Sequence, residues 1–182
     1  MIALRLATSF LIAATVLGGS AAGATADTAP PGDIPDNQAF VRFNGHGYSL
    51  KTPEGWGRTA HGAVVTFADK FNAIRIEIGK SATPPSTASV KRQDVPKLKT
   101  TARGFQLRAI TRLARPAGPV ILTTYRAASA PDNVTGKTIT EDVERYSYWK
   151  AGRLATITLE APRGSDNVDA WKLITTSFRW GG

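Results

Sequence analysis

The sequence contains no cysteine among its 182 residues. A chain without cysteine forms no disulfide, carries no thiol nucleophile, and offers no lipid attachment point at a cleaved N-terminus. Histidine is nearly absent as well, with only His46 and His61. Neither shows the tight spacing with Asp or Glu that a metal site would need, because such sites take about four ligands of matched geometry. We therefore expect no metal and no cofactor.

Sequence motifs of the common catalytic classes are also missing. The chain has no nucleophile elbow, no phosphate-binding loop and no dinucleotide fingerprint. Glu141, Asp142 and Glu144 lie close together in the sequence, and paired carboxylates can act as general acid and base. On a strand, however, Asp142 and Glu144 share a face, where cross-strand partners such as Arg126 or Arg153 would make an ordinary polar sheet surface. The sequence predicts a protein that is not an enzyme.

The first 26 residues have the composition of a secretory signal peptide. Arg5 is their only charged residue, residues 10–19 form an apolar run, and small residues follow it. The run is shorter than the about 20 residues that cross a bilayer. We expect cleavage after about Ala26 and a secreted or periplasmic protein, and the short alanine-rich leader is typical of bacteria.

The rest of the chain divides into a short tether and one domain. Residues 27–39 contain three prolines and three aspartates with little to bury, which predicts a disordered tether. Residues 40–182 have a length that suits a single domain with one core. A core is required because no disulfide can hold the fold together.

Short β-rich segments occupy residues 40–80 and 105–162. Ile74, Ile76 and Ile78 alternate with polar residues, which indicates a half-buried strand. The same rule splits the strand over residues 105–113, with one face carrying Phe105, Leu107, Ala109 and Leu113 and the other carrying Gln106, Arg108, Ile110 and Arg112. Asn44-Gly45 and residues 150–153 suit tight hairpin turns. Closely spaced strands of this kind predict a mainly antiparallel sheet.

Two segments have helical spacing. In residues 86–104 the apolar stripe consists of Val90, Val95, Leu98 and Ala102, and Pro96 must kink or restart the helix because it lacks an amide hydrogen. In residues 165–178, with Ser165 or Asp166 as the N-cap, the stripe consists of Val168, Trp171, Ile174 and Phe178. Both stripes need covering, so the helices should pack on the sheet in an α+β fold.

Two segments carry a resemblance to a known family. YSLKTPEGW (residues 48–56) and WKLITTSFRW (residues 171–180) enclose a hairpin, a helix and further strands. In this order they resemble the PsbP-like fold family, which includes the extrinsic photosystem II subunit PsbP and related bacterial secreted and envelope proteins. The resemblance implies an antiparallel sheet flanked by helices, an α/β/α sandwich, and a non-catalytic role in binding or assembling a larger partner. The matching residues, which look architectural, are Pro53, Gly55, Trp56, Ser177 and Phe178.

Positive charge is concentrated in the middle of the sequence. Residues 70–115 contain eleven basic and two acidic side chains, a net charge of +9, against −2 for residues 27–69 and +1 for residues 116–182. The basic residues of the expected helix and of the strand after it are Lys91, Arg92, Lys97, Lys99, Arg103, Arg108 and Arg112. A surface of this sign attracts anionic lipid head groups, cell-wall polymers and acidic protein faces. Nucleic acid is disfavoured by the export signal.

These features predict an exported, non-catalytic binding or assembly module. Its basic surface would engage an anionic membrane or envelope component, or an acidic protein, with peripheral membrane contact. One alternative is a purely structural envelope protein, in which the basic segment is only a solvated face. The other alternative is a domain that binds a small ligand or is weakly catalytic, with a pocket near the aromatic residues Trp56, Tyr146, Tyr148 and Trp149.

Overall fold

The computed structural model describes residues 32–132 and 135–181. The expected signal peptide, residues 1–26, and the first part of the expected tether, residues 27–31, lie outside the described residues. Within the described ranges, no helix is both long enough and apolar enough to cross a membrane.

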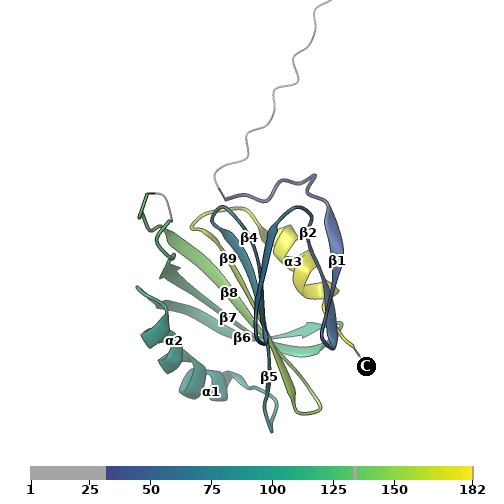
Figure 1. Cartoon of the computed structure of the whole chain (residues 1–182). Helices are drawn as coiled ribbons and strands as arrows, with labels where there is room; N and C mark the ends of the chain where they lie inside the picture. Colours follow the sequence, from purple (N-terminus) through teal and green to yellow (C-terminus); the bar gives the residue numbers. More distant parts are fainter. Residues whose placement is uncertain (1–31, 133–134, 182) are drawn as a thin grey trace, which may run out of the picture.

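The strands form two antiparallel sheets (Figure 1). The small sheet contains, in spatial order, β1 (Phe40–Gly45), β2 (Tyr48–Pro53) and β10 (Arg179–Trp180). The large sheet contains, in spatial order, β3 (Gly57–His61), β4 (Val64–Asp69), β5 (Asn72–Lys80), β9 (Arg153–Pro162), β8 (Thr140–Lys150), β7 (Gly118–Ala128) and β6 (Gln106–Arg115). The expected antiparallel sheet is confirmed.

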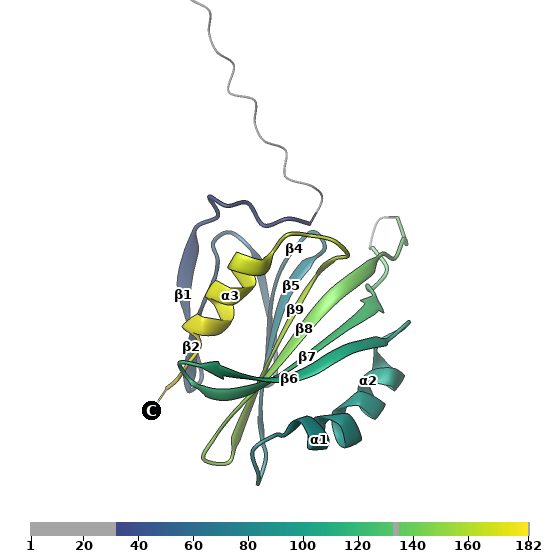
Figure 2. The ribbon, with the colours of Figure 1, turned by 180° about the vertical axis from the view of Figure 1, so that it is seen from behind.

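Helices cover both faces of the large sheet. On one face lies α3 (Val168–Ser177) together with the β1–β2 hairpin, and on the other lies a helical segment made of α1 (Thr87–Ser89), the π-helix η1 (Val90–Asp94) and α2 (Val95–Thr101). Figures 1 and 2 show this arrangement from opposite sides. The predicted α+β fold, with helices flanking an antiparallel sheet, is confirmed.

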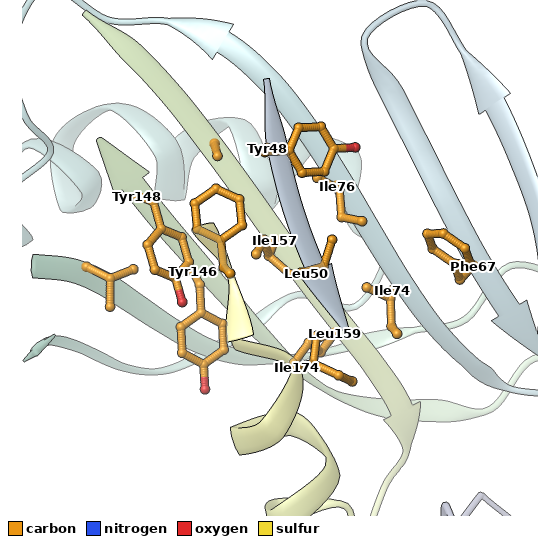
Figure 3. Close-up of a cluster of buried hydrophobic side chains, with 13 residues drawn as sticks. Tyr48, Leu50, Phe67, Ile74, Ile76, Tyr146, Tyr148, Ile157, Leu159 and Ile174 are labelled. Atoms are coloured by element: carbon orange, nitrogen blue, oxygen red, sulfur yellow. The ribbon is translucent and has the colours of Figure 1, made fainter. Parts of the chain in front are cut away.

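The main hydrophobic core lies between the large sheet, the β1–β2 hairpin and α3 (Figure 3). Alternate residues of β5 and β9 face it, as the sequence pattern predicted, and Ile74 and Ile76 lie in register with Leu159 and Ile157. All four of these side chains are fully buried. The period of two therefore places one apolar face of the sheet against the core.

The C-terminal helix is fixed to this core by aromatic contacts and a hydrogen bond. Phe178, which follows α3, is fully buried, and its ring centroid lies 4.6 Å from that of Tyr148. The Tyr148 hydroxyl donates a hydrogen bond to the Thr175 carbonyl at 2.8 Å. Of the expected apolar stripe, Ile174 is also buried, but Val168 is 71% exposed. The prediction is wrong at Val168 because the first turn of α3 extends past the core.

Residues 32–39 pack on the domain, contrary to the expected tether. Ile34 is buried, and its amide donates to the Asn167 side-chain oxygen at 2.6 Å. The Asp166 amide donates to the Asp33 carboxylate at 2.9 Å. Asn167 is also the N-cap of α3 in place of the expected Ser165 or Asp166. The domain thus begins before Phe40, because this segment satisfies polar groups at the start of α3.

The helical segment on the opposite face behaves largely as its sequence indicated. Ser86 forms a reciprocal capping box with Ser89. The π-helical turn, in which the Val95 amide donates to the Val90 carbonyl, precedes Pro96, and α2 restarts with Pro96 in its first turn. Val90 and Val95 are buried against the sheet. The predicted restart at proline and the predicted apolar stripe are confirmed.

Of the two predicted hairpin turns, one agrees with the sequence-based expectation and one differs. The β8–β9 turn lies at Ala151-Gly152, with φ angles of 47° and 81°, as predicted. The first hairpin turns at His46-Gly47 instead of Asn44-Gly45, which belong to β1. Gly47 has a φ of 75° and its carbonyl accepts the Gly181 amide at 2.9 Å, so the C-terminal strand helps to fix this turn.

A β-bulge in β6 overturns the predicted faces of this strand. Leu107 lies in register with Tyr125, but the next paired residue is Ala109, in register with Thr124. Arg108 is therefore the extra, unpaired residue of the bulge. Leu107 and Ala109, expected on one face, lie on opposite faces of the sheet.

We expect Phe178→Ala to lower the free energy of unfolding by about 3–5 kcal/mol, because it leaves a cavity in the core. Val168→Ala in the same helix should cost less than about 0.5 kcal/mol, since Val168 is 71% exposed. Urea unfolding followed by tryptophan fluorescence measures both values. Equal losses for the two variants would contradict the core assignment.

Candidate functional site

An open groove lies between α2 and the large sheet. It has a volume of about 820 Å³ and is lined by α2, by the loop after β7, and by strands β5, β7, β8 and β9. A smaller hollow of about 270 Å³ adjoins it and shares Glu77, Lys97 and Arg145 with its lining. We call the two together the α2 groove.

The groove exists because the helical segment touches the sheet at only a few points. Val90 and Val95 anchor its middle, and Leu98 and Ala102 pack on a small cluster of Tyr125, Ala127 and Val143. The floor that remains is polar, although much of it is buried. Its buried hydroxyl-bearing residues are Thr156 and Thr158 of β9.

Basic side chains on the floor have partners for some of their polar atoms. Arg75 forms an ion pair with Glu77 at 3.5 Å, and both side chains are about half exposed. Arg145 donates from Nη1 to the Thr158 hydroxyl at 3.2 Å, while its Nε is buried without a hydrogen-bond partner. Arg145 is thus held in place with donor capacity left over.

Two acidic side chains on the floor differ from these. Glu141 is 8% exposed and Glu160 is half-buried, and within the described ranges neither forms an ion pair or a hydrogen bond. Burial, and then the charge of Glu160, raises the pKa of Glu141 from 4.5 to about 7. Burial also raises the pKa of Glu160, against the opposing charge of Arg75. The groove therefore contains a carboxyl group that titrates near neutral pH.

The basic residues singled out in the sequence are all exposed. None of them forms an ion pair among the residues that the structure describes. Lys97 and Arg103 lie at the edge of the α2 groove. Lys91, Arg92 and Lys99 lie on the same helical segment.

The two arginines of β6 do not share a face as expected. Arg112 lies in register with Ile121, on the side of the helical segment, whereas Arg108 is displaced by the bulge. The structure thus places four of the expected basic residues on the helical segment, namely Lys91, Arg92, Lys97 and Lys99, with Arg103 in the turn that follows it.

The expected aromatic pocket is not formed, because its members lie on different sides of the large sheet or at its margin. Tyr146 and Tyr148 face the main core, where both are buried. Trp149 is the next residue of the strand and faces the other way, with its indole NH donating to the Ser81 carbonyl at 2.8 Å. Trp56 packs against the edge of the core after β2. Alternation along β8 separates residues that are adjacent in sequence.

A separate hollow of about 350 Å³ lies beside α3 and includes Tyr146 in its lining. The Tyr146 hydroxyl donates to the Glu144 carboxylate at 2.5 Å, and Arg115 lies over the Tyr146 ring at 5.8 Å. Asp142 pairs with Arg126 at 2.7 Å, the cross-strand partner that the sequence suggested. Both carboxylates on this face are therefore engaged. No group of three or more acidic or histidine side chains suited to a metal is present in residues 32–132 and 135–181.

Sequence reasoning missed the floor of the α2 groove. Glu141, Val143 and Arg145 alternate with the core-facing residues of β8, so their common face was readable in the sequence. Glu160 lies in register with Val143 and joins them from β9. The sequence did not reveal that α2 would cover this face of the sheet but contact only part of it, which leaves the groove open.

Comparison with known proteins identifies the class of fold. No protein-family model matches the sequence, and no curated protein matches it. The solution structure of cyanobacterial PsbP from Synechocystis sp. PCC 6803 matches with a TM-score of 0.57 and 16% identity, over 84% of this chain and 98% of that chain. LpqN of Mycobacterium tuberculosis, described as involved in cell envelope biogenesis, matches with a TM-score of 0.46 and 15% identity, over 84% and 90%. The chain has the PsbP-like fold, as its sequence suggested.

The buried carboxyl of Glu141 predicts a pH-dependent effect of Glu141→Gln. Its pKa is about 7 in the folded protein and about 4.5 when unfolded. Between pH 4.5 and about pH 7, the folded state therefore keeps the Glu141 proton that the unfolded state has lost. The free energy of unfolding of the wild type should fall as the pH rises through this range. The variant should be more stable than wild type above pH 7, by roughly 1–3 kcal/mol, and should gain little below about pH 4.5.

Urea titrations at several pH values measure this difference. Glu77→Gln is the matched control, because Glu77 lies in the same groove but is half exposed and paired with Arg75. A gain for Glu141→Gln that did not depend on pH, or an equal pH trend in the control, would contradict the assignment.

Proposed function

We propose that the protein is an exported, non-catalytic binding module that engages an anionic component of the membrane or cell envelope. The contact would be made by a basic surface, defined by Lys91, Arg92, Lys97 and Lys99 of the helical segment and by Arg103 in the turn after it. The observation that carries the proposal is that these five side chains are exposed and have no ion-pair partner among the described residues.

Charge balance supports this surface. Asp94 is the only acidic residue between positions 86 and 104. Cations gathered without counter-charges create a positive potential that attracts anionic partners over about 10 Å at ordinary ionic strength. These cations also repel one another. An acidic surface brought against them would offset that mutual repulsion, which supports an anionic partner over a neutral one.

The rigidity of the segment supports a binding role as well. The Ser86 capping box fixes its start, and buried Val90 and Val95 hold its middle on the sheet. The backbone amide of Ala128 donates to the Arg103 carbonyl at 2.7 Å, which fixes its end. Basic side chains on a fixed scaffold lose less conformational freedom on binding than those on a free loop.

Anionic vesicles test the proposal directly. The protein without its expected signal peptide should sediment with vesicles rich in phosphatidylglycerol, or with isolated envelope material, and binding should weaken at least about tenfold between 50 and 300 mM salt. Changing Lys91, Arg92, Lys97 and Lys99 to glutamate should abolish this binding.

A matched variant separates the surface from the overall charge. Lys137, Lys150, Arg163 and Lys172 are exposed and belong to other parts of the chain than the helical segment, and changing them to glutamate alters the net charge by the same amount. This control should retain most of the binding. Equal loss in both variants, or no binding of the wild type to either material, would refute the proposal.

A further inference from the structure

The floor of the α2 groove contains two acidic side chains without a direct partner among the described residues, although the charge of Arg75 acts on Glu160. Glu141 projects from β8 and Glu160 from β9, on the face covered by the helical segment. Glu141 is 8% exposed, and neither side chain has an ion pair or hydrogen bond among the residues described. Their carboxylate oxygens open onto the groove, since none of them is among the buried polar atoms that lack a hydrogen-bond partner in the described residues. A carboxylate in such a partly desolvated place is stabilised by a donor or a positive charge brought against it.

The other acidic side chains of β5 and β8 have partners. Glu77 pairs with Arg75, Asp142 with Arg126, and Glu144 accepts the Tyr146 hydroxyl. Glu141 and Glu160 are therefore exceptions to the rule that this sheet otherwise follows. Both border the open groove of about 820 Å³, which the paired Glu77 also lines, so a ligand has room to reach them.

The walls beside these carboxylates are apolar. Leu98 of α2, Tyr125 and Ala127 of β7 and Val143 of β8 line the same cavity. The Tyr125 ring is buried, and burial raises its pKa to about 12, so the phenol stays neutral. An occupant thus meets an aliphatic and aromatic wall next to two carboxylates.

We propose that the α2 groove binds a protonated amine carried on a short aliphatic chain, with the ammonium group at Glu141 and Glu160 and the chain against the apolar wall. The ammonium supplies hydrogen-bond donors and a positive charge directly at two carboxylates that have no direct partner among the described residues. This site rests on other residues than the proposed basic surface, namely the two carboxylates on the groove floor, although Lys97 and Arg103 border both.

A hard metal cation fits this pair less well than an amine does. Calcium takes six to eight oxygen ligands, typically from several carboxylates and carbonyls. The described part of the chain has no cluster of three or more side chains suited to a metal. The aliphatic wall provides no oxygen ligand for a metal ion. An alkylammonium uses both kinds of surface.

Charged and titratable groups around Glu141 determine how binding depends on pH. Those lining the groove are Asp94 of η1, Lys97 of α2, Arg103 in the turn after it, Arg75 and Glu77 of β5, Tyr125 of β7, Arg145 of β8 and Glu160 of β9. The net effect of burial and Glu160 leaves the pKa of Glu141 at about 7. The amine must displace a proton below that value, so affinity should rise as pH increases toward 8.

The test is a titration of the isotopically labelled protein, without its expected signal peptide, with n-pentylamine, followed by amide chemical shifts. At pH 8 the shifts should cluster at Val143, Tyr125 and Ala161, and the affinity should fall about tenfold at pH 6. Glu141→Gln and Glu160→Gln should each weaken binding about tenfold or more at pH 8, since each removes one charged acceptor. Glu77→Gln, the matched control in the same groove, should change it less than about twofold.

Further probes identify the source of the amine and the nature of the contact. Nα-acetyl-lysine methylamide stands for a lysine side chain of a peptide, and tighter binding than pentylamine would identify a peptide source, whereas tighter binding of pentylamine would identify a free amine. The proposal is overturned if pentylamine causes no shifts at pH 8, if 1-pentanol binds equally well, if both glutamine variants bind as wild type, or if calcium produces the same shifts.

Discussion

The division of the large sheet into a closed face and an open face depends on β8, whose successive side chains point to opposite faces. Even-numbered residues from Asp142 to Tyr148 face α3, and odd-numbered residues from Glu141 to Trp149 face the helical segment. Because β8 pairs with β7 on one side and β9 on the other, its alternation sets the faces of both neighbours. A shift of one residue would exchange a closed aromatic core with a polar groove.

The two faces are closed to different degrees for a physical reason. On the α3 side, large apolar side chains from the sheet, the β1–β2 hairpin and Phe178 fill the space, and the Tyr148 hydroxyl satisfies a helix carbonyl. On the other side, the helical segment is short and interrupted at Pro96, and it reaches the sheet through few apolar side chains. Threonine hydroxyls and charged groups form the floor there, so the space between remains open to a polar occupant.

Patterns of local origin were readable from the sequence, and those that depend on distant contacts were not. Alternation in residues 74–78, the restart at Pro96 and the turn at Ala151-Gly152 were predicted, because each follows from neighbouring residues. The β6 bulge and the turn at His46-Gly47 were missed, since pairing with β7 and with the C-terminal strand decides them. The α2 groove was missed for the same reason, because strands far apart in sequence contribute its floor.

The cations and the carboxylates of this face respond to different variables, although Lys97 and Arg103 border the groove that contains Glu141. The cations are exposed, so dissolved salt screens their attraction to a partner. Glu141 is buried, and burial together with the charge of Glu160 raises its pKa to about 7. Screening by salt acts weakly on such a group, whereas protonation removes its charge altogether. One face of the sheet can thus carry two adjacent binding surfaces, one controlled by salt and the other by pH.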